Sequence, residues 1–125
     1  MSSVIAIFAT VSGCERKVEE TKVTLTGGNP KRGKIAIRNY GCGTCHRIPG
    51  IYGANGVVGP PLEGVGTRSF LAGMLPNTPE NMMRWVRKPQ DVNPRKVMPD
   101  VGVTESDARD IAAYLYTLGE STPIR

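Results

Sequence analysis

The run Cys42-Gly43-Thr44-Cys45-His46 restricts the possible folds of this chain more than any other feature of the sequence. The pattern C-x-x-C-H is typical of covalent attachment sites for c-type haem. Two cysteines three positions apart at a helix start can both reach the edge of one porphyrin. His46 can then offer an imidazole nitrogen to the iron. Because His46 is the only histidine in the chain, no other imidazole is present to replace it.

The composition suits a small domain that folds around a bulky apolar group. The 125 residues include two Phe, one Trp and four Tyr, against fifteen Gly and ten Pro. A single domain of this size with so few large side chains has little with which to build a dry core, and a buried macrocycle would add apolar surface. A loop-rich domain of marginal stability is the alternative. The net charge of +5 is moderate and no basic run is interleaved with aromatics, so nucleic-acid binding is not expected.

The first 13 residues are expected to be an export signal. Residues 4–11 are apolar and far shorter than the roughly 20 residues that span a bilayer. They lead into Val11-Ser12-Gly13-Cys14, which resembles the lipobox of bacterial lipoproteins. Lipidation of Cys14 would hold the protein in the bacterial cell envelope, on the periplasmic or outer side of the cytoplasmic membrane. A hydrophobic tail with an incidental thiol is the alternative.

Residues 14–29 are first charged and then rich in Thr and Gly, without a sustained helical stripe. This pattern predicts a lipidated anchor followed by a flexible tether with a span of about 20–25 Å. A short docking strand through Val23 and Leu25 is the alternative.

Three helices are predicted in the segment 30–119. Asn29, Thr78 and Thr104 are suitable N-caps, and Pro follows the first two at the first helical position. Asp107 gives the third helix an approximate capping box. The first helix should end near Tyr40, before Gly41, the second at Pro89 and the third at Gly119. No strand alternation is convincing, so the sequence predicts an all-α domain with a Gly/Pro-rich loop over 48–67 and a C-terminal tail over 120–125.

From residue 29 to residue 118 the chain resembles the class I c-type cytochromes. The resemblance depends on motifs in a fixed order: Gly33 with Ile37 in the first helix, the C-x-x-C-H site, Gly59-Pro60-Pro61-Leu62 with Gly64 and Arg68, Val97-Met98-Pro99, and Ile111-Ala112-Ala113-Tyr114-Leu115. The segment from Leu75 to Pro99 is especially similar to the cytochrome c domain fused to subunit two of some haem–copper oxidases.

The resemblance implies a class I cytochrome c fold, in which three main helices and Gly/Pro-rich loops wrap one covalently attached haem c. It implies that the carbonyl of Pro60 accepts a hydrogen bond from the axial imidazole. It also implies that Arg68 pairs with a haem propionate, that Trp85 lines the methionine side and that Met98 is the second axial ligand.

Other uses of the motif remain open. Cys42 and Cys45 could form a thioredoxin-type redox pair, although no strand precedes them. A zinc site built from Cys14, Cys42, Cys45 and His46 has a suitable ligand count. It would require residue 14 to fold back over some thirty positions, and it leaves the Gly-Pro-Pro-Leu run and Met98 unexplained. Haem attachment is therefore favoured.

Met98 is favoured among the five methionines as the iron ligand. Met82 and Met83 lie on the second predicted helix, where Met82 has core-facing spacing. Met74, in a Gly-rich loop, is the rival. Pro99 restricts the backbone of Met98, which helps to hold its thioether at a fixed reach.

Coordination by His46 and Met98 would make the protein an electron carrier. Both axial positions would be filled, and the thioether would favour ferrous iron. The sequence therefore predicts one-electron transfer in a respiratory chain, to a terminal oxidase or another envelope oxidoreductase, with no small-molecule substrate. A fixed subunit of a respiratory complex is the first alternative. A haem peroxidase or sensor, which needs a labile Met98, is the second.

Basic side chains are expected around the haem edge, and acidic ones cluster where the last helix begins. A basic rim would steer the protein toward acidic redox partners, and charges spread for solubility are the alternative. The basic set is Arg47, Arg84, Arg87, Lys88, Arg95 and Lys96, and the acidic set is Glu105, Asp107 and Asp110.

Overall fold

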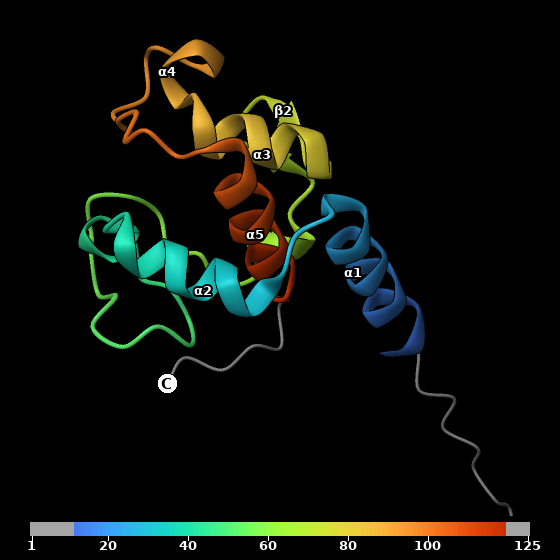
Figure 1. Cartoon of the computed structure of the whole chain (residues 1–125). Helices are drawn as coiled ribbons and strands as arrows, with labels where there is room; N and C mark the ends of the chain where they lie inside the picture. The colour runs from blue at the N-terminus through green and yellow to red at the C-terminus, as the bar shows by residue number, and fades with distance from the viewer. Residues whose placement is uncertain (1–11, 120–125) are drawn as a thin grey trace, which may run out of the picture.

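The computed structural model describes residues 12–119 (Figure 1). The expected tail at 120–125 and all but the last two residues of the expected export signal lie outside the described residues. The described chain consists mainly of helices: α1 (Ser12–Thr26), α2 (Pro30–Asn39), α3 (Pro79–Arg87), α4 (Pro89–Val92) and α5 (Glu105–Tyr116). Short 3-10 turns η1 (Cys42–Thr44) and η2 (Val65–Thr67) and two-residue strands β1 (Phe70–Leu71) and β2 (Leu75–Pro76) complete it. The prediction of an all-α domain is confirmed.

The three predicted N-caps begin α2, α3 and α5. The side-chain oxygen of Asn29 accepts hydrogen bonds from the amides of Lys31 and Arg32, at 2.9 and 3.1 Å. The hydroxyls of Thr78 and Thr104 each accept one from the amide three residues later, at 3.2 and 3.1 Å. These bonds satisfy amides that a helix start leaves without partners. Helix α5 ends at Tyr116, three residues before the predicted stop at Gly119.

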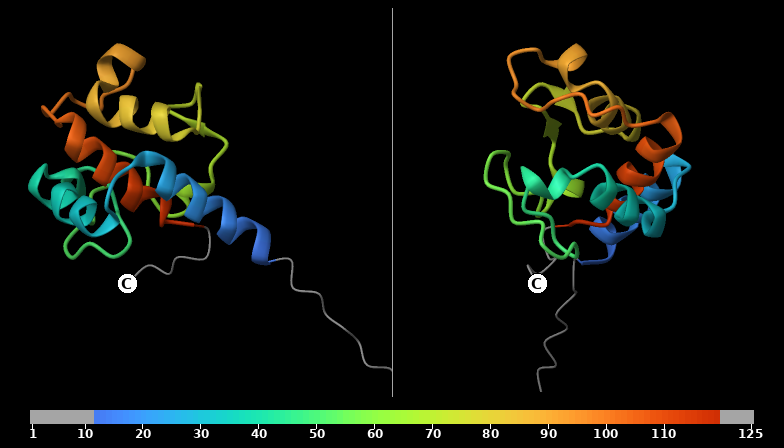
Figure 2. Two further views of the ribbon diagram at one scale, coloured as in Figure 1. Left: turned by 45° about the vertical axis from the view of Figure 1, so that its right-hand side comes forward. Right: turned by 60° about the vertical axis from the view of Figure 1, so that its left-hand side comes forward.

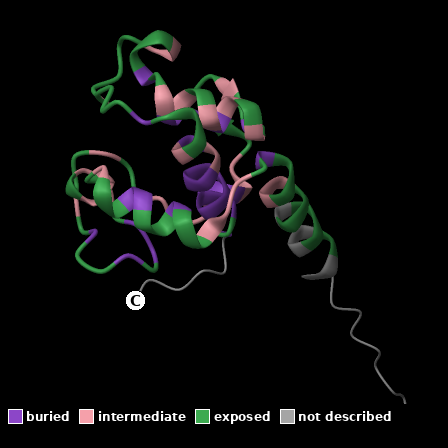
Figure 3. Cartoon of the chain, in the orientation of Figure 1, coloured by how far each residue is buried: buried purple, intermediate pink, exposed green. Residues whose placement is uncertain are grey.

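Helices α2 and α5 cross at close range and form the centre of the fold (Figures 1 and 2). A Cβ atom at Gly33 would lie 1.8 Å from the carbonyl oxygen of Asp110, so only glycine permits this crossing. Ile37 and Ile111 are buried beside it, and most of α5 is buried (Figure 3). Gly33 and Ile37, the two residues of the first helix that carry the family resemblance, thus both lie at this crossing.

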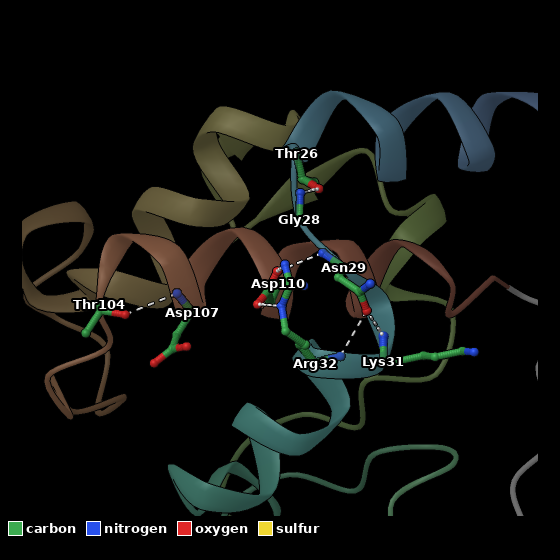
Figure 4. A network of polar contacts seen from close by, with 8 residues as sticks. All are labelled: Thr26, Gly28, Asn29, Lys31, Arg32, Thr104, Asp107 and Asp110. Carbon is green, nitrogen blue, oxygen red and sulfur yellow. Dashed lines mark hydrogen bonds and ion pairs between the residues drawn. The ribbon is translucent and has the colours of Figure 1, made fainter.

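A buried carboxylate ties α2 to α5 beside the crossing (Figure 4). Asp110 is 4% exposed and accepts two hydrogen bonds from the guanidinium of Arg32, at 2.8 and 3.1 Å. It accepts a third from the amide of Asn29, at 2.7 Å. The hydrogen bond from Arg32 is the main reason that the pKa of Asp110 lies below its ordinary value, while burial acts in the opposite direction. Asp110, one of the three acidic residues expected to cluster at the start of α5, thus has a structural role.

The structure corrects the expected tether over 14–29, because Ser12–Thr26 forms helix α1. The alternative of a docking strand is also wrong. Thr26 is buried, and Val23 packs against the hydrophobic core. The Lys22 ammonium lies 5.2 Å from the ring centroid of Tyr116 on α5. Packing on the rest of the protein stabilises a helix whose own apolar pattern is weak.

A second correction concerns the segment before α3. Phe70 pairs with Pro76 and Leu71 with Leu75 in a short antiparallel hairpin, where no strand was expected. Strands of two residues are too short to show alternation in the sequence. The hairpin leaves the fold class unchanged.

No helix in the described part of the chain is both long and apolar enough to cross a bilayer.

Candidate functional site

The Cys-x-x-Cys-His run forms a tight turn directly after α2. Gly41 has a φ of 72°, which ends the helix, and the amides of Cys45 and His46 both donate to the carbonyl of Cys42, at 3.2 and 3.0 Å. Both thiols are free and half-buried. Burial, with a smaller contribution from Cys45, raises the pKa of the Cys42 thiol above its usual value. The turn therefore presents two free thiols next to one imidazole in the sequence.

The imidazole of His46 lies against the Gly-Pro-Pro-Leu loop. Its Nδ1 atom is 2.7 Å from the carbonyl oxygen of Pro60. A Cβ atom at Gly59 would lie 2.4 Å from Cε1 of the ring, so the loop approaches this closely only because residue 59 is glycine. A proton on Nδ1 would be held by the carbonyl, which leaves Nε2 to bind a metal. This is the contact that the family resemblance implies.

Glycines also let the loop after His46 pack closely on the turn. A Cβ atom at Gly43 would lie 2.7 Å from the Cβ atom of Ala54, and one at Gly56 would lie 2.4 Å from the carbonyl oxygen of Thr44. Ile48 and Ile51, in the same loop, are buried. The loop after His46 thus packs directly against the cysteine turn.

Arg68 has protein partners in this structure. Its guanidinium donates to the carbonyl oxygens of Pro61 and Glu63, the second at 3.2 Å. Its role toward a propionate stays a prediction.

Sequence reasoning missed Glu63, whose carboxylate accepts a hydrogen bond from Nε of Arg47 at 2.7 Å. The only signal in the sequence was a pair of opposite charges, one directly after the histidine and the other after the loop.

Met98 lies in the irregular segment between α4 and α5. Its carbonyl accepts a hydrogen bond from the side-chain amide of Gln90 at 2.8 Å. Its side chain is half-buried, whereas Met74 is 56% exposed. Met82 is 1% exposed and belongs to the core, which confirms its expected packing role. Trp85 on α3 is half-buried.

The loop after His46 and the segment that carries Met98 extend to the same side of α5 (Figures 1 and 2). In Figure 1 the loop is the green trace below and the segment is the orange trace above. This arrangement suits two ligands that approach one group from opposite faces.

The zinc alternative receives no support. Within residues 12–119 no three metal-binding side chains of the His, Cys, Asp and Glu types gather into a site. Cys14 is exposed on the first turn of α1. The cysteines of the motif follow a helix and not a strand, unlike a thioredoxin-type pair.

The residues around the turn fit a covalently attached haem. The turn supplies two free thiols and an imidazole against a carbonyl oxygen, and the segment between α4 and α5 supplies a half-buried thioether, that of Met98. Large apolar side chains beside these groups are exposed: Val57 by 92%, Val58 by 69% and Val97 by 80%. An apolar ring system bound there would remove such side chains from water.

Three residues of the expected basic rim, Arg84, Arg87 and Lys88, line one cavity, and the place of the rim relative to the haem edge stays a prediction. A hollow of about 250 Å³ lies between α3 and the start of α5. Arg87 lines it, and its Nε is buried without a partner among the described residues. Lys88 pairs with Asp100 at 2.9 Å, so part of the basic charge is already neutralised. The lining is Glu80, Met83, Arg84, Arg87, Lys88, Glu105 and Arg109.

Comparison with known proteins matched the chain to a family and to a curated relative. The sequence profile of the family described as Cytochrome c matches residues 30–119. Cytochrome c oxidase subunit 2 of Alkalihalophilus pseudofirmus is 33% identical over 111 residues, which cover 88% of this chain and 30% of the relative. The chain therefore spans less than a third of the curated relative that it matches.

Proposed function

The chain belongs to the cytochrome c family, and we propose on this basis that it carries single electrons in a respiratory chain, with His46 and Met98 as iron ligands. Cytochromes of this family hold haem c covalently and are generally electron carriers. The fold is the all-α fold of a class I c-type cytochrome. One observation carries the proposal: the only imidazole of the chain is oriented by Pro60 beside two free thiols.

Each residue of the site has a separate task. The thiols of Cys42 and Cys45 would hold the haem through thioether bonds. The carbonyl of Pro60 would keep the proton on Nδ1 of His46, so that Nε2 faces the iron in a fixed orientation. When bound, the haem supplies an iron that changes its oxidation state by one electron. The Gln90 hydrogen bond would limit the backbone motion of Met98.

Two protein ligands would make the site a carrier and not an enzyme. If His46 and Met98 both bound the iron, no coordination position would be left for oxygen or a substrate. The iron could change charge with little rearrangement. The exposure of Met74 makes it the weaker candidate for the sixth ligand.

Optical spectra of both oxidation states of the haem-loaded protein test the ligands. We expect the weak far-red band of ferric iron bound to methionine. Met98→Ala should abolish this band, while Met74→Ala, the matched control, should leave it. Loss of the band in Met74→Ala alone would overturn the assignment of Met98. Carbon monoxide binding by the reduced wild-type protein at neutral pH would indicate an open site and favour a peroxidase or sensor.

The electron acceptor in our proposal is a terminal oxidase or another envelope oxidoreductase with an acidic docking surface. The support is the match to an oxidase subunit and the basic side chains on α3 and near Met98. A mobile carrier steered by charge should deliver electrons more slowly as salt rises. Because the relative is a subunit of an oxidase, a fixed subunit is the second candidate. Copurification with an oxidase in detergent, together with turnover that does not respond to salt, would favour it.

We propose that Cys14 carries a lipid that attaches the protein to the bacterial cell envelope. The thiol is exposed on the first turn of α1, where an anchor would not disturb the packing of Val23 and Thr26. Mass spectrometry of the mature protein should detect the acyl chains, and Cys14→Ser should release the protein from membranes. A wild-type mature chain that lacks acyl chains would contradict the anchor.

A further inference from the structure

The loop that contacts His46 has an unusual shortage of backbone donors. Pro60 and Pro61 are consecutive and have no amide hydrogen. The backbone therefore attaches the loop to the haem-attachment segment only on either side of them. The amide of Gly59 donates to the carbonyl of Cys45 at 2.7 Å, and that of Leu62 donates to the carbonyl of Arg47 at 2.9 Å.

Side chains provide the remaining attachments. Arg68 donates to the carbonyl oxygens of Pro61 and Glu63. Arg47, the residue directly after His46, donates from Nε to the carboxylate of Glu63 at 2.7 Å. The Glu63 side chain is 20% exposed. Its second carboxylate oxygen is buried without a partner among the described residues.

A partly buried ion pair of this kind is a poor source of stability. Desolvation of the carboxylate offsets much of the attraction, and the unpaired oxygen adds a further cost. An apolar residue at position 63 would avoid both. A pair that is costly and also directly joins the residue after His46 to the end of the proline loop is better explained by positioning.

We propose that Arg47 and Glu63 form a positioning pair that keeps the carbonyl of Pro60 against Nδ1 of His46. The inference builds on the proposed role of His46 as iron ligand and extends it to two residues that do not touch the haem iron. A firm hydrogen bond from Nδ1 makes the imidazole a stronger donor, which favours ferric iron and lowers the reduction potential. Loosening the loop should raise that potential.

The test uses potentials whose signs separate positioning from simple charge. We would measure the midpoint potential of the haem-loaded full chain at high ionic strength, which screens exposed charges. Removing the negative charge in Glu63→Gln raises the potential on either account. Removing the positive charge in Arg47→Gln should lower it by charge alone, whereas loss of positioning raises it. We expect both variants to shift upward, and the double variant to shift no further than either single variant.

A second readout reports on the hydrogen bond directly. In the reduced, nitrogen-15-labelled protein, the Nδ1 proton of His46 should exchange with water about tenfold faster in both variants. Loss of a partner to a metal-bound histidine typically costs about 10–100-fold in metal affinity or activity, and we take the lower end of that range for the exchange rate. Arg47→Lys, which retains a donor, should restore most of the protection.

Lys88 and Asp100 provide the matched control, because they form an exposed ion pair at 2.9 Å on a different part of the chain. Lys88→Gln and Asp100→Asn should leave the exchange of the His46 proton unchanged. If the midpoint potential shifted in opposite directions in Arg47→Gln and Glu63→Gln, and the proton exchange of His46 did not change, the positioning role would be overturned. The proposed function would not be affected by that result. A wild-type chain without the spectrum of His-ligated haem c would overturn the proposed function together with this inference.

Discussion

The helical centre and the loops that carry the candidate ligands are built in different ways. Where α2 crosses α5, Gly33 allows backbone contact and Asp110 is hydrogen-bonded to both Arg32 and Asn29. In the loops, by contrast, Val57 and Val97 are almost fully exposed. The helical centre completes its own packing, whereas the loop region exposes apolar side chains that a haem at the proposed site would cover. Stability in this protein should therefore depend on the cofactor unevenly along the chain.

Removal of the haem should change the difference in stability between the loops and the helical centre more than any other variant. A chain with Cys42→Ala and Cys45→Ala cannot form the thioether bonds, and its loops lose the surface against which they would pack. We expect lower overall stability, with the greatest loss of amide-exchange protection over residues 48–64 and 93–103 and the least in α2 and α5. Hydrogen-exchange mass spectrometry of both chains measures this gradient. A uniform loss would contradict the division into two regions.

Gly33→Ala should damage the helical centre. Alanine favours an isolated helix by about 1 kcal/mol over glycine, but here its Cβ atom would meet the carbonyl oxygen of Asp110 at 1.8 Å. The clash should push α2 away from α5. This loss of packing should exceed the gain in helix propensity and lower the free energy of unfolding by about 2 kcal/mol. Urea denaturation measures it. Lys34→Ala, on the exposed side of the same helix, is the control and should be nearly neutral. Equal stability of the two variants would show that the crossing is not tight.

Asp110→Asn should cost about 2 kcal/mol at neutral pH, because it removes a charged acceptor from a buried hydrogen-bonded site. The Arg32 hydrogen bond lowers the folded-state pKa of Asp110 below its unfolded value of about 3.9. The stabilisation is thus complete above that unfolded value and is lost as pH falls through the folded pKa.

Urea denaturation at a series of pH values checks this prediction. The wild-type protein should lose more stability on acidification than Asp110→Asn does. Asp100→Asn, in a more exposed ion pair, should change stability by less than about 1 kcal/mol. Identical acid dependence in wild type and Asp110→Asn would exclude the carboxylate as a link between α2 and α5.

Tyr116→Phe should have the smallest effect and acts where the two regions meet. Its hydroxyl donates to the side-chain oxygen of Asn77 at 2.8 Å. The amide of Asn77 in turn donates to the carbonyls of Val65 and Arg68, at 3.0 and 2.7 Å. We expect a loss of about 1 kcal/mol and faster amide exchange over residues 65–69.

Tyr114→Phe provides the matched comparison, because that hydroxyl donates to the carbonyl of Pro49 at 2.6 Å. In Tyr114→Phe, the faster amide exchange should appear near residue 49. Faster exchange at the same residues in both variants would show that the two tyrosines do not attach separate loops.

Much of the fold was accessible from local signals. The caps at Asn29, Thr78 and Thr104 depend on side-chain bonds within three residues, and all three are present. Helix α1 was missed because its contacts with Tyr116 and Gly66 join residues more than forty positions apart. The hairpin at residues 70–76 was missed because its strands are too short to show a period.

The site divides along the same line. The C-x-x-C-H run and the Gly-Pro-Pro-Leu loop indicated haem attachment without any coordinates, because the residues of each motif are neighbours in the sequence. The approach of Pro60 to His46 was expected only through the family resemblance, since fourteen positions separate the two residues. The partners of Arg68 and the pairing of Arg47 with Glu63 could not be anticipated. A charged side chain selects its partner by distance in the folded chain, and sequence spacing does not encode that distance.

Local chemistry was thus determined by the sequence: the cysteine turn, the helix starts, the glycine at the crossing and the choice of haem over zinc. The tertiary structure decided which side chains come together around that chemistry: it packs α1 on the core, buries Asp110 and joins Arg47 to Glu63. The physical reason is range. Capping and turn formation involve neighbours within four residues, whereas burial and ion pairing depend on segments that only folding brings together.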